Sequence, residues 1–266
     1  MQRLIRQARA VATGAAQVLD PSRSVDSGEA PDWFARYGIR HVAVIPDGNR
    51  RWARDRRLAP MIGHTTGLLE TLPRLVRGLS ARNVHTVTAW GFSTENWSRA
   101  RSEVEHLMKI FADFLENQVL QIAEDNDGRL VHLGRKDRLP DSVLSRIEHA
   151  EKVTRDNRSH VYNMAIDYGG QDELERAARR MREAIAGGAD PAALGLQDFL
   201  DTAGQPHPNP DLIIRSSGEQ RMSGFMPLQS IYTELFFVEQ QFPEFNIEML
   251  DAVADQFGAR KRRYGS

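Results

Sequence analysis

The chain has 266 residues, 41% of them hydrophobic, so it can bury one substantial core and needs no second domain to do so. Its formal net charge of −1 lacks the basic excess of a typical nucleic-acid-binding protein, so no nucleic-acid partner is expected and any affinity for phosphate must be local. The absence of cysteine excludes disulfides, thiolate catalysis and sulfur-ligated zinc, and it agrees with a reducing cytoplasm, where we expect the protein.

Residues 1–39 are predicted to form an N-terminal helix and a linker. Apolar residues recur at helical spacing from Leu4 to Leu19, and the segment from Pro21 to Pro31 is rich in Ser, Asp and Gly. A helix packed on the body is the preferred interpretation, and a helix lying on a membrane surface is the alternative. No apolar run approaches the roughly 20 residues that span a bilayer, and no secretory signal is recognisable, so the protein is predicted to be neither membrane-spanning nor exported.

From residue 40 to residue 266, short β-rich runs alternate with segments of helical period. This order predicts one α/β domain with a central, mainly parallel six-stranded sheet flanked by helices. Ligands of such sheets bind beyond the carboxyl ends of the strands, so the chemistry is expected in the loops that follow them. The expected strands are His41–Pro46, Val84–Phe92, Arg129–Gly134, His160–Asp167, Asp211–Arg215 and Glu234–Val238.

The loop after the first predicted strand has the composition of a phosphate site. Gly48 permits a tight turn, backbone amides ahead of a helix can face an anion, and the Arg51 guanidinium matches phosphate oxygens. A carboxylate such as Asp47 beside phosphate requires an intervening cation, and Mg²⁺ prefers that combination of ligands. An Asp-Gly turn with solvated arginines is the alternative. The full motif is Asp47-Gly48-Asn49-Arg50-Arg51-Trp52.

Two later loops carry similar groups. In the segment from Phe92 to Arg99, hydroxyls, an amide and an arginine can bind phosphate while aromatic rings shield an apolar tail; the alternative is a loop pinned by a buried Trp97. The segment from Arg215 to Ser223 holds two arginines and several hydroxyls around a glycine, which predicts a second anion site. The domain is therefore expected to bind two phosphate groups.

Two single residues are weaker candidates. Glu234 opens the last predicted strand, where its carboxylate can either bind a metal ion or cap the strand. His64 lies at the expected start of a helix, where an imidazole can contact a diphosphate, although an isolated histidine is more often structural.

Taken together, these motifs resemble those of the cis-prenyltransferases, the family of undecaprenyl diphosphate synthase. The resemblance extends from His41 to the C-terminus and includes Gly63-His64, Tyr168-Gly169-Gly170 and the terminal Arg263-Tyr264-Gly265. It implies a homodimer whose subunits each surround an apolar tunnel. With Mg²⁺, such an enzyme extends an allylic diphosphate (dimethylallyl, geranyl or farnesyl) with isopentenyl diphosphate, forming Z double bonds. The helix from Glu103 to Asp125 is the expected wall of that tunnel.

The resemblance also implies a role for each site residue. Asp47 matches the catalytic magnesium ligand, and Asn96 matches a catalytic residue proposed to take part in proton removal. Glu234 would complete the metal site from the other subunit. The expected substrate-binding residues are Gly48, Asn49, Arg51 and His64 for the allylic diphosphate, with Arg50 and Trp52 beside them; Ser93, Trp97 and Arg99 in a loop that closes over the substrates, with Thr94 and Glu95 beside them; and Arg215, Arg221 and Ser223 for isopentenyl diphosphate.

Three positions depart from the family pattern. Pro60 stands where an arginine is common, Gln171 stands where another arginine is usual, and Met226-Pro227-Leu228 replaces Leu-Leu-Trp. These changes can be neutral repacking, or they can alter the dimer contact and the preferred substrate.

Product length stays open, because Gly91 is small whereas Trp90, Phe111 and Phe114 are large. A long-chain carrier lipid, a short Z-prenyl diphosphate and a branched or cyclised product are all compatible with the sequence. Contact with a membrane surface is expected only through an apolar product or the N-terminal helix.

Functions outside this enzyme class are disfavoured. A non-catalytic, lipid-binding partner subunit would typically lose the Asp-Gly-Asn loop, which this chain retains together with Asn96 and Arg215. A nucleotide-binding protein is disfavoured because neither G-x-G-x-x-G nor G-x-x-x-x-G-K-[ST] occurs.

Overall fold

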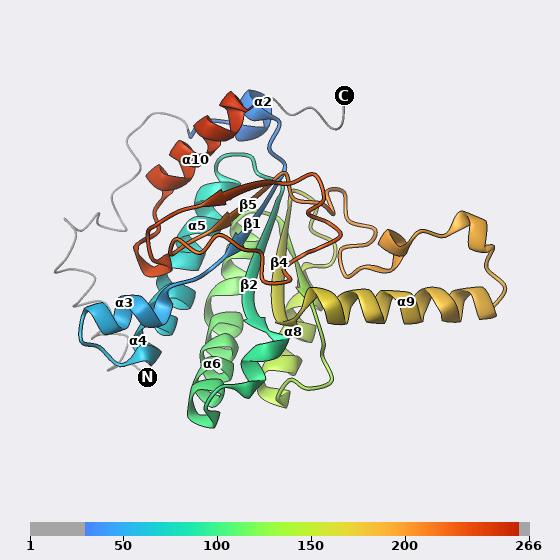
Figure 1. The fold of residues 1–266 in the computed structure, drawn as a ribbon, viewed down its shortest axis with the longest axis horizontal. Helices are drawn as coiled ribbons and strands as arrows, with labels where there is room; N and C mark the ends of the chain where they lie inside the picture. The colour runs from blue at the N-terminus through green and yellow to red at the C-terminus, as the bar shows by residue number, and fades with distance from the viewer. Residues whose placement is uncertain (1–29, 261–266) are drawn as a thin grey trace.

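The folded body is built on a sheet of six strands. The structure, a computed structural model, describes residues 30–260 (Figure 1). Across the sheet the strand order is β3-β4-β2-β1-β5-β6, and each neighbouring pair runs parallel. The predicted six-stranded α/β fold is confirmed, with every one of these pairings parallel. The strands are β1 (His41–Ile45), β2 (Thr86–Ser93), β3 (Gly128–Leu133), β4 (His160–Tyr168), β5 (Leu212–Arg215) and β6 (Glu234–Phe237).

The two faces of the sheet are covered differently. Val42 and Val44 of β1 belong to the larger core, which most of the helices share, whereas Ala43 and Ile45 belong to a smaller cluster with Phe225. Successive side chains of a strand point to opposite faces, which explains this division. All five residues of β1 are buried, as expected for a central strand of a parallel sheet covered on both sides.

Helices surround the sheet, and Figure 1 shows α9 projecting from the body. Within residues 30–260, no helix combines the length and the apolar character that crossing a membrane requires. The helices are α2 (Trp33–Tyr37), α3 (Asn49–Asp55), α4 (Pro60–Thr66), α5 (Leu72–Ser80), α6 (Arg101–Phe114), α7 (Leu120–Asp125), α8 (Asp141–Thr154), α9 (Gly170–Ala186) and α10 (Ile247–Ala259). Short 3₁₀ turns are η2 (Thr94–Ser98), η4 (Pro191–Ala193), η5 (Leu196–Phe199) and η6 (Phe242–Glu244).

Two long helical segments, α4 to α5 and α6 to α7, each contain a π-helical turn. The turn η1 (Gly67–Thr71) joins α4 to α5, and the turn η3 (Leu115–Val119) joins α6 to α7. The Gln118 side chain donates a hydrogen bond to the Leu69 carbonyl at 3.1 Å, so the two helical segments are linked at these turns. π-turns are rare and often lie beside functional sites. The helix predicted from Glu103 to Asp125 is confirmed as α6, η3 and α7.

The folded body begins before residue 40, where the sequence places the domain boundary. Asp32 caps α2 by accepting a hydrogen bond from the Ala35 amide at 2.8 Å, and Trp33 is only 1% exposed. The Trp33 indole donates to Asp251 of α10 at 3.2 Å, and Figure 1 shows the two helices side by side. Residues 32–37 are therefore part of the domain rather than linker. The predicted N-terminal helix and the C-terminal Arg-x-Gly motif lie outside the described residues.

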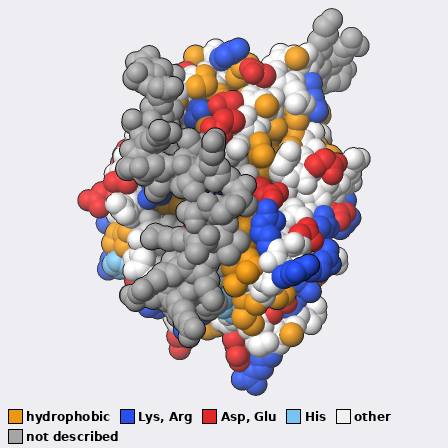
Figure 2. All heavy atoms as spheres, turned by 90° about the vertical axis from the view of Figure 1, so that its left-hand side faces the viewer, with side chains coloured by type: hydrophobic (Ala, Val, Ile, Leu, Met, Phe, Trp, Pro, Cys, Tyr) orange, Lys and Arg blue, Asp and Glu red, His pale blue; other side chains and the backbone are white. Residues whose placement is uncertain are grey.

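Surface charges are mixed in sign. Figure 2 shows Lys and Arg side chains beside Asp and Glu side chains on the face that it presents, with hydrophobic side chains among them. Exposed pairs such as Arg101 with Glu105, at 2.7 Å, typically contribute about 0–1 kcal/mol to stability. A strong anion site is therefore expected from buried or half-buried arginines rather than from these surface pairs.

Buried histidines are expected to make the fold less stable in acid. His41 is fully buried, and burial lowers its pKa to about 3; burial likewise lowers the pKa of His132. A histidine in the unfolded chain has a pKa of about 6.5, so below that pH the unfolded state binds more protons than the folded one. The free energy of unfolding therefore falls as the pH drops from about 6.5 towards 3, and His41 alone contributes about 2 kcal/mol of that loss between pH 7 and 5.

Urea denaturation of the protein at pH 7, 6 and 5 measures this effect. His41→Gln should flatten the pH dependence, whereas the control His149→Gln, at an exposed position of α8, should leave it unchanged. An unfolding free energy that is constant over this range would contradict a neutral, buried imidazole at position 41.

Candidate functional site

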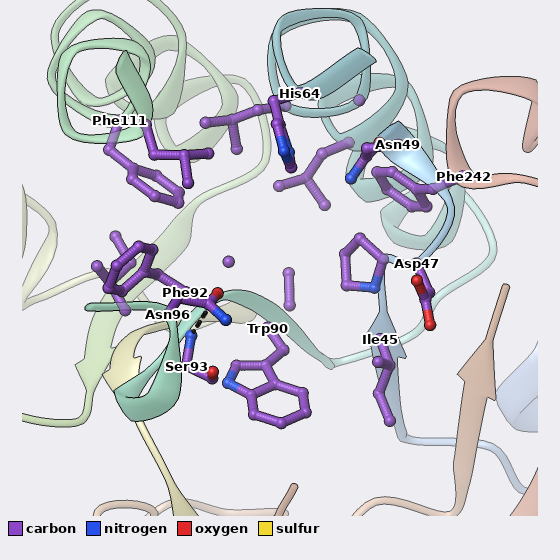
Figure 3. A pocket seen from close by; sticks show the side chains of 18 of the residues that line it. Ile45, Asp47, Asn49, His64, Trp90, Phe92, Ser93, Asn96, Phe111 and Phe242 are labelled. Atoms are coloured by element: carbon purple, nitrogen blue, oxygen red, sulfur yellow. Dashed lines mark hydrogen bonds between the residues drawn. The ribbon is translucent and has the colours of Figure 1, made fainter. Parts of the chain in front are cut away.

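A pocket of about 240 Å³ lies beside the carboxyl ends of β1, β2 and β5 (Figure 3). Because β1 lies between β2 and β5, the loops that follow these three strands meet at one edge of the sheet. The polar part of the pocket lining consists of Asp47, Asn49, His64, Ser93, Asn96, Arg99, Arg215 and Ser223. The apolar part comes from β2, β4, η1, α5 and α6, with Ile45, Pro46 and Phe242 beside them, and it includes Leu68, Leu72, Ala89, Trp90, Phe92, Leu107, Ile110, Phe111, Met164 and Ile166.

The loop after β1 is fixed to the loop after β5. The Asp47 amide donates a hydrogen bond to the Ser216 hydroxyl, and that hydroxyl donates to the Asp47 carbonyl, each at 2.8 Å. The Asp47 carboxylate accepts from the Arg215 guanidinium at 2.8 Å and from the Gly48 amide at 2.7 Å. Gly48 has φ +90°, and a Cβ there would lie 2.6 Å from the Ser217 hydroxyl, so this turn requires glycine.

Arg215 is the buried cation of the pocket. Its side chain is 7% exposed and also donates to the Ser223 hydroxyl at 2.9 Å and to the Arg221 carbonyl. The surrounding loop contains non-glycine residues with positive φ at Ser217 and Ser223. Such conformations are strained, and they persist where the surrounding contacts hold them, often at binding sites. The loop therefore holds the guanidinium in one orientation beside Asp47.

Close helix packing places Asn49 and His64 in the same pocket. A Cβ on Gly63 would lie 1.9 Å from the Asn49 carbonyl oxygen, and a Cβ on Gly67 would lie 2.4 Å from the Asn49 side-chain oxygen. These two glycines let α4 and η1 approach the start of α3. The Asn49 Oδ1 and His64 Nε2 atoms are buried and have no hydrogen-bond partner among the described residues. Figure 3 shows both side chains at the cavity, where a ligand can pair with them.

The loop after β2 forms the other side of the polar lining. Asn96 Oδ1 accepts a hydrogen bond from the Ser93 amide at 3.2 Å, which fixes the start of η2. Trp97 packs edge-on against Phe92, with ring centroids 5.1 Å apart, and its indole donates to Asp167 at 2.9 Å. Trp97 is half-buried and thus anchors the loop through these two contacts, while Ser93, Asn96 and Arg99 line the pocket.

Several predicted site residues lie outside the pocket lining. Trp52 is 3% exposed and packs with Ala53 and Ile62, so it supports α3 rather than facing the cavity. The other predicted residues that are not part of the lining are Gly48, Arg50, Arg51, Thr94, Glu95, Trp97, Arg221 and Glu234.

The charged residues of that group are engaged elsewhere. Arg51 donates to the Ser217 carbonyl at 2.9 Å and contacts Glu219, while Arg221 pairs with the same glutamate. Glu234 begins β6, whose far end pairs with Arg215, so it lies at the opposite end of the strand from the pocket. Its carboxylate pairs with Arg260.

Sequence reasoning missed a part of the pocket lining. Leu68, Leu72 and Leu107 belong to apolar helical stripes, which look the same whether they face a core or a cavity. Phe242 follows β6 and reaches the pocket because its amide donates to the Asp47 carbonyl at 2.9 Å. We find no sequence signal that indicates this contact.

The residues at the pocket fit Mg²⁺ held jointly with a substrate. Among residues 30–260 there is no cluster of three or more Asp, Glu, His or Cys side chains that could bind a metal without further ligands. The Asp47 side chain is 31% exposed at the pocket, however, and Mg²⁺ commonly binds one or two carboxylates together with phosphate oxygens and waters. Asp47 is therefore the residue that would hold the ion.

This parallel α/β fold and this pocket, polar at the strand ends and apolar between the helices, define a protein for ligands with an anionic head and a hydrocarbon tail. The prenyltransferase family model, that of undecaprenyl diphosphate synthase, matches residues 45–265. The chain belongs to this family of prenyl transferases.

Individual relatives agree with the family match. An isoprenyl transferase of Caulobacter vibrioides is 38% identical over 229 residues, which cover 85% of this chain and 87% of the relative. A tritrans,polycis-undecaprenyl-diphosphate synthase (geranylgeranyl-diphosphate specific) of Thermococcus kodakarensis is also 38% identical, over 85% of this chain and 86% of its own. The crystal structure of lavandulyl diphosphate synthase from Lavandula x intermedia, in complex with dimethylallyl diphosphate, has a TM-score of 0.82 and 31% identity, covering 86% of this chain and 98% of that one.

Proposed function

We propose that this prenyl transferase condenses isopentenyl diphosphate with an allylic prenyl diphosphate, forms a Z double bond and releases diphosphate. The observation that carries the proposal is the pocket, in which Asp47, Asn49, His64, Arg99 and Arg215 lie next to an apolar cavity. A diphosphate binds to polar and positively charged groups such as these, and a hydrocarbon chain is buried in an apolar cavity.

The same residues suit the chemistry. Departure of diphosphate from an allylic carbon leaves positive charge on carbon and gathers negative charge on oxygen, so fixed donors aimed at the leaving oxygens lower the barrier. Mg²⁺ bound at Asp47 would supply further charge neutralisation. In this proposal Arg99 and His64 contact one diphosphate, and Arg215 and Ser223 contact another; that all four residues line one pocket supports this. Asn96, fixed against Ser93, is the proposed participant in proton removal from the new carbon–carbon product.

We propose that the active form is a homodimer, in which Glu234 of one subunit approaches Asp47 of the other. Within one chain the two carboxylates lie at opposite ends of the sheet, so only a second copy can bring them together. β6 is an edge strand, and the adjacent Ile231 and Tyr232 are 62% and 68% exposed, which favours a partner at this edge. Action in the cytoplasm, with membrane contact through an apolar product, completes the proposal.

A short or branched product is the second candidate. Phe111 closes on Gly91, where an added Cβ would lie 2.8 Å from the Phe111 ring, and the cavity of about 240 Å³ is small for a long polyprenyl chain. The structural similarity to a lavandulyl diphosphate synthase supports this candidate, whereas the similarity to an undecaprenyl diphosphate synthase supports the long-chain one. A tunnel for long products would require Phe111 and its neighbours to move.

Product analysis separates these candidates. The protein is incubated with Mg²⁺, labelled isopentenyl diphosphate and dimethylallyl, geranyl or farnesyl diphosphate in turn, and also with dimethylallyl diphosphate alone. A ladder of added five-carbon units indicates Z-elongation and gives the product length, while a ten-carbon product from dimethylallyl diphosphate alone indicates branching. If no diphosphate is released from any combination, the enzyme proposal fails and a lipid-binding subunit becomes the better explanation.

A further inference from the structure

Glu103, in the first turn of α6, lies between three basic side chains, those of Arg50, His64 and Arg99. Its Oε1 atom accepts a hydrogen bond from the Arg99 guanidinium at 3.0 Å and lies 3.4 Å from His64 Nε2. Its Oε2 atom lies 3.9 Å from an Arg50 guanidinium nitrogen. These contacts come from four separate places in the chain: the start of α3, the middle of α4, the residue after η2 and the start of α6. The Glu103 side chain is only 15% exposed.

The cluster adjoins the polar lining of the pocket. His64 and Arg99 are lining residues, whereas Glu103 itself is not. The carboxylate therefore contacts two side chains that also line the cavity. Any anion that enters the pocket next to His64 and Arg99 meets groups that already have an anionic partner. The Glu103 carboxylate and a bound anion would repel each other, so they cannot both interact closely with the Arg99 guanidinium and the His64 imidazole.

The Glu103 carboxylate does not provide hydrogen bonds for all the donors around it. Arg99 makes a proper hydrogen bond to Glu103, but His64 Nε2 has no hydrogen-bond partner among the described residues, and the Arg50 contact is at the limit of an ion pair. The pKa of His64 is lowered to about 4, first by burial and then by the charge of Arg99, while Glu103 opposes that shift. A diphosphate has more oxygens and more charge than one carboxylate, so it can use donors that Glu103 leaves unsatisfied.

We propose that Glu103 is an internal competitor for the anion site: its carboxylate holds Arg99 and His64 in the absence of ligand, and a bound diphosphate displaces it from them. The arrangement keeps Arg99 and His64 ordered without a ligand and lowers the affinity of the site for diphosphate. Weaker binding of the diphosphate product matters for an enzyme that must release diphosphate after each condensation. Binding that is equally strong in the ground state and the transition state does not accelerate the reaction. The ligand class assumed here rests on the proposed function.

The test compares the affinity of the protein for inorganic pyrophosphate, in excess Mg²⁺, by isothermal titration calorimetry. Glu103→Gln keeps the shape of the side chain and removes its charge, and we expect it to tighten pyrophosphate binding about three- to tenfold. Glu105→Gln is the matched control, because it removes the same charge two residues further along α6, from a glutamate whose ion-pair partner is the exposed Arg101. The control should change the affinity less than twofold.

The direction of the change distinguishes competition from support. If Glu103 merely positions Arg99 and His64 for the ligand, or stabilises the helix start through its charge, Glu103→Gln will weaken binding or leave it equal to the control, and the proposal is overturned. Should Glu103→Gln fold poorly, Glu103→Asp retains the charge but withdraws it from Arg99, and it should tighten binding by a smaller factor. Because pyrophosphate binding needs no turnover, tighter binding in a protein that shows no prenyl transfer would sustain this proposal while the proposed reaction fails.

Discussion

Replacement of Asp47 by Asn is expected to reduce prenyl transfer by at least about 10³-fold while the protein stays folded. The amide retains the shape of the side chain and can still accept from the Gly48 amide, but it loses the negative charge that a magnesium ion and Arg215 require. Arg215 keeps its bonds to the Ser223 hydroxyl and the Arg221 carbonyl, so its guanidinium is not left without acceptors. We therefore expect a loss of stability of only about 1–3 kcal/mol.

The measurement is kcat/KM with isopentenyl diphosphate and the best allylic substrate, together with thermal unfolding followed by circular dichroism. Asp55→Asn is the matched control, because Asp55 ends α3, the helix that begins just after Asp47, and its carboxylate contacts Gln241 and Arg54 at the surface. The control should retain activity within about twofold. Normal activity in Asp47→Asn would contradict the metal role of this carboxylate and would require another residue to hold the ion.

The fold could be predicted because its signals are local. The strands are short runs rich in apolar residues, and β1, buried on both faces, continues from His41 to Ile45 with four apolar residues in a row. Parallel pairing of the first five strands then follows from the helices between them, whereas β5 and β6 pair in parallel with no helix between them. The domain start could not be predicted from the same signals, since the segment around Trp33 contains only one short helix. Its place in the body depends on a contact with α10, which comes from the far end of the chain.

The positions of the site loops could be predicted, because the order of the strands brings the loops together. The contacts that individual side chains make could not be predicted in the same way. Asp47 and Asn96 follow β1 and β2, and Arg215 ends the adjacent β5, so their meeting at one edge is a consequence of topology. Arg51 carries the same chemistry as Arg215 but turns to Ser217 and Glu219, and no local pattern indicates that choice. The position of a phosphate-binding loop can therefore be predicted from the sequence more securely than the partners of the arginines in it.

Glu103 illustrates a second limit of the sequence. At the start of a helix, an acidic residue is usually explained by the helix dipole, so nothing in the sequence distinguishes it from Glu105. The structure separates them, because one carboxylate faces Arg99 and His64 beside the pocket while the other pairs with Arg101 in solvent. Long-range packing of α4 against α6 creates that difference.

Gly63→Ala is expected to reduce activity by about 100-fold and stability by about 3 kcal/mol, through backbone crowding alone. The new Cβ would lie 1.9 Å from the Asn49 carbonyl oxygen and 2.7 Å from its carbonyl carbon. Both atoms are backbone, so no side-chain rotation relieves the clash and α4 must move away from α3. A shift of this kind displaces Asn49 and His64 together, and misplacement by about 1 Å is enough to cause the activity loss.

The comparison variant is Gly187→Ala at the end of α9, where the nearest backbone oxygens would lie 3.3 and 3.4 Å from the new Cβ. That contact is tolerable, so the control should unfold at the wild-type temperature and keep its activity. The Gly63 variant should lose both, and pyrophosphate should bind it more weakly, because two of the donors in the pocket have moved apart from Asp47 and Arg215. Wild-type stability and activity in Gly63→Ala would mean that α3 and α4 pack less tightly than described, and that the position of Asn49 does not depend on the absence of a side chain at residue 63.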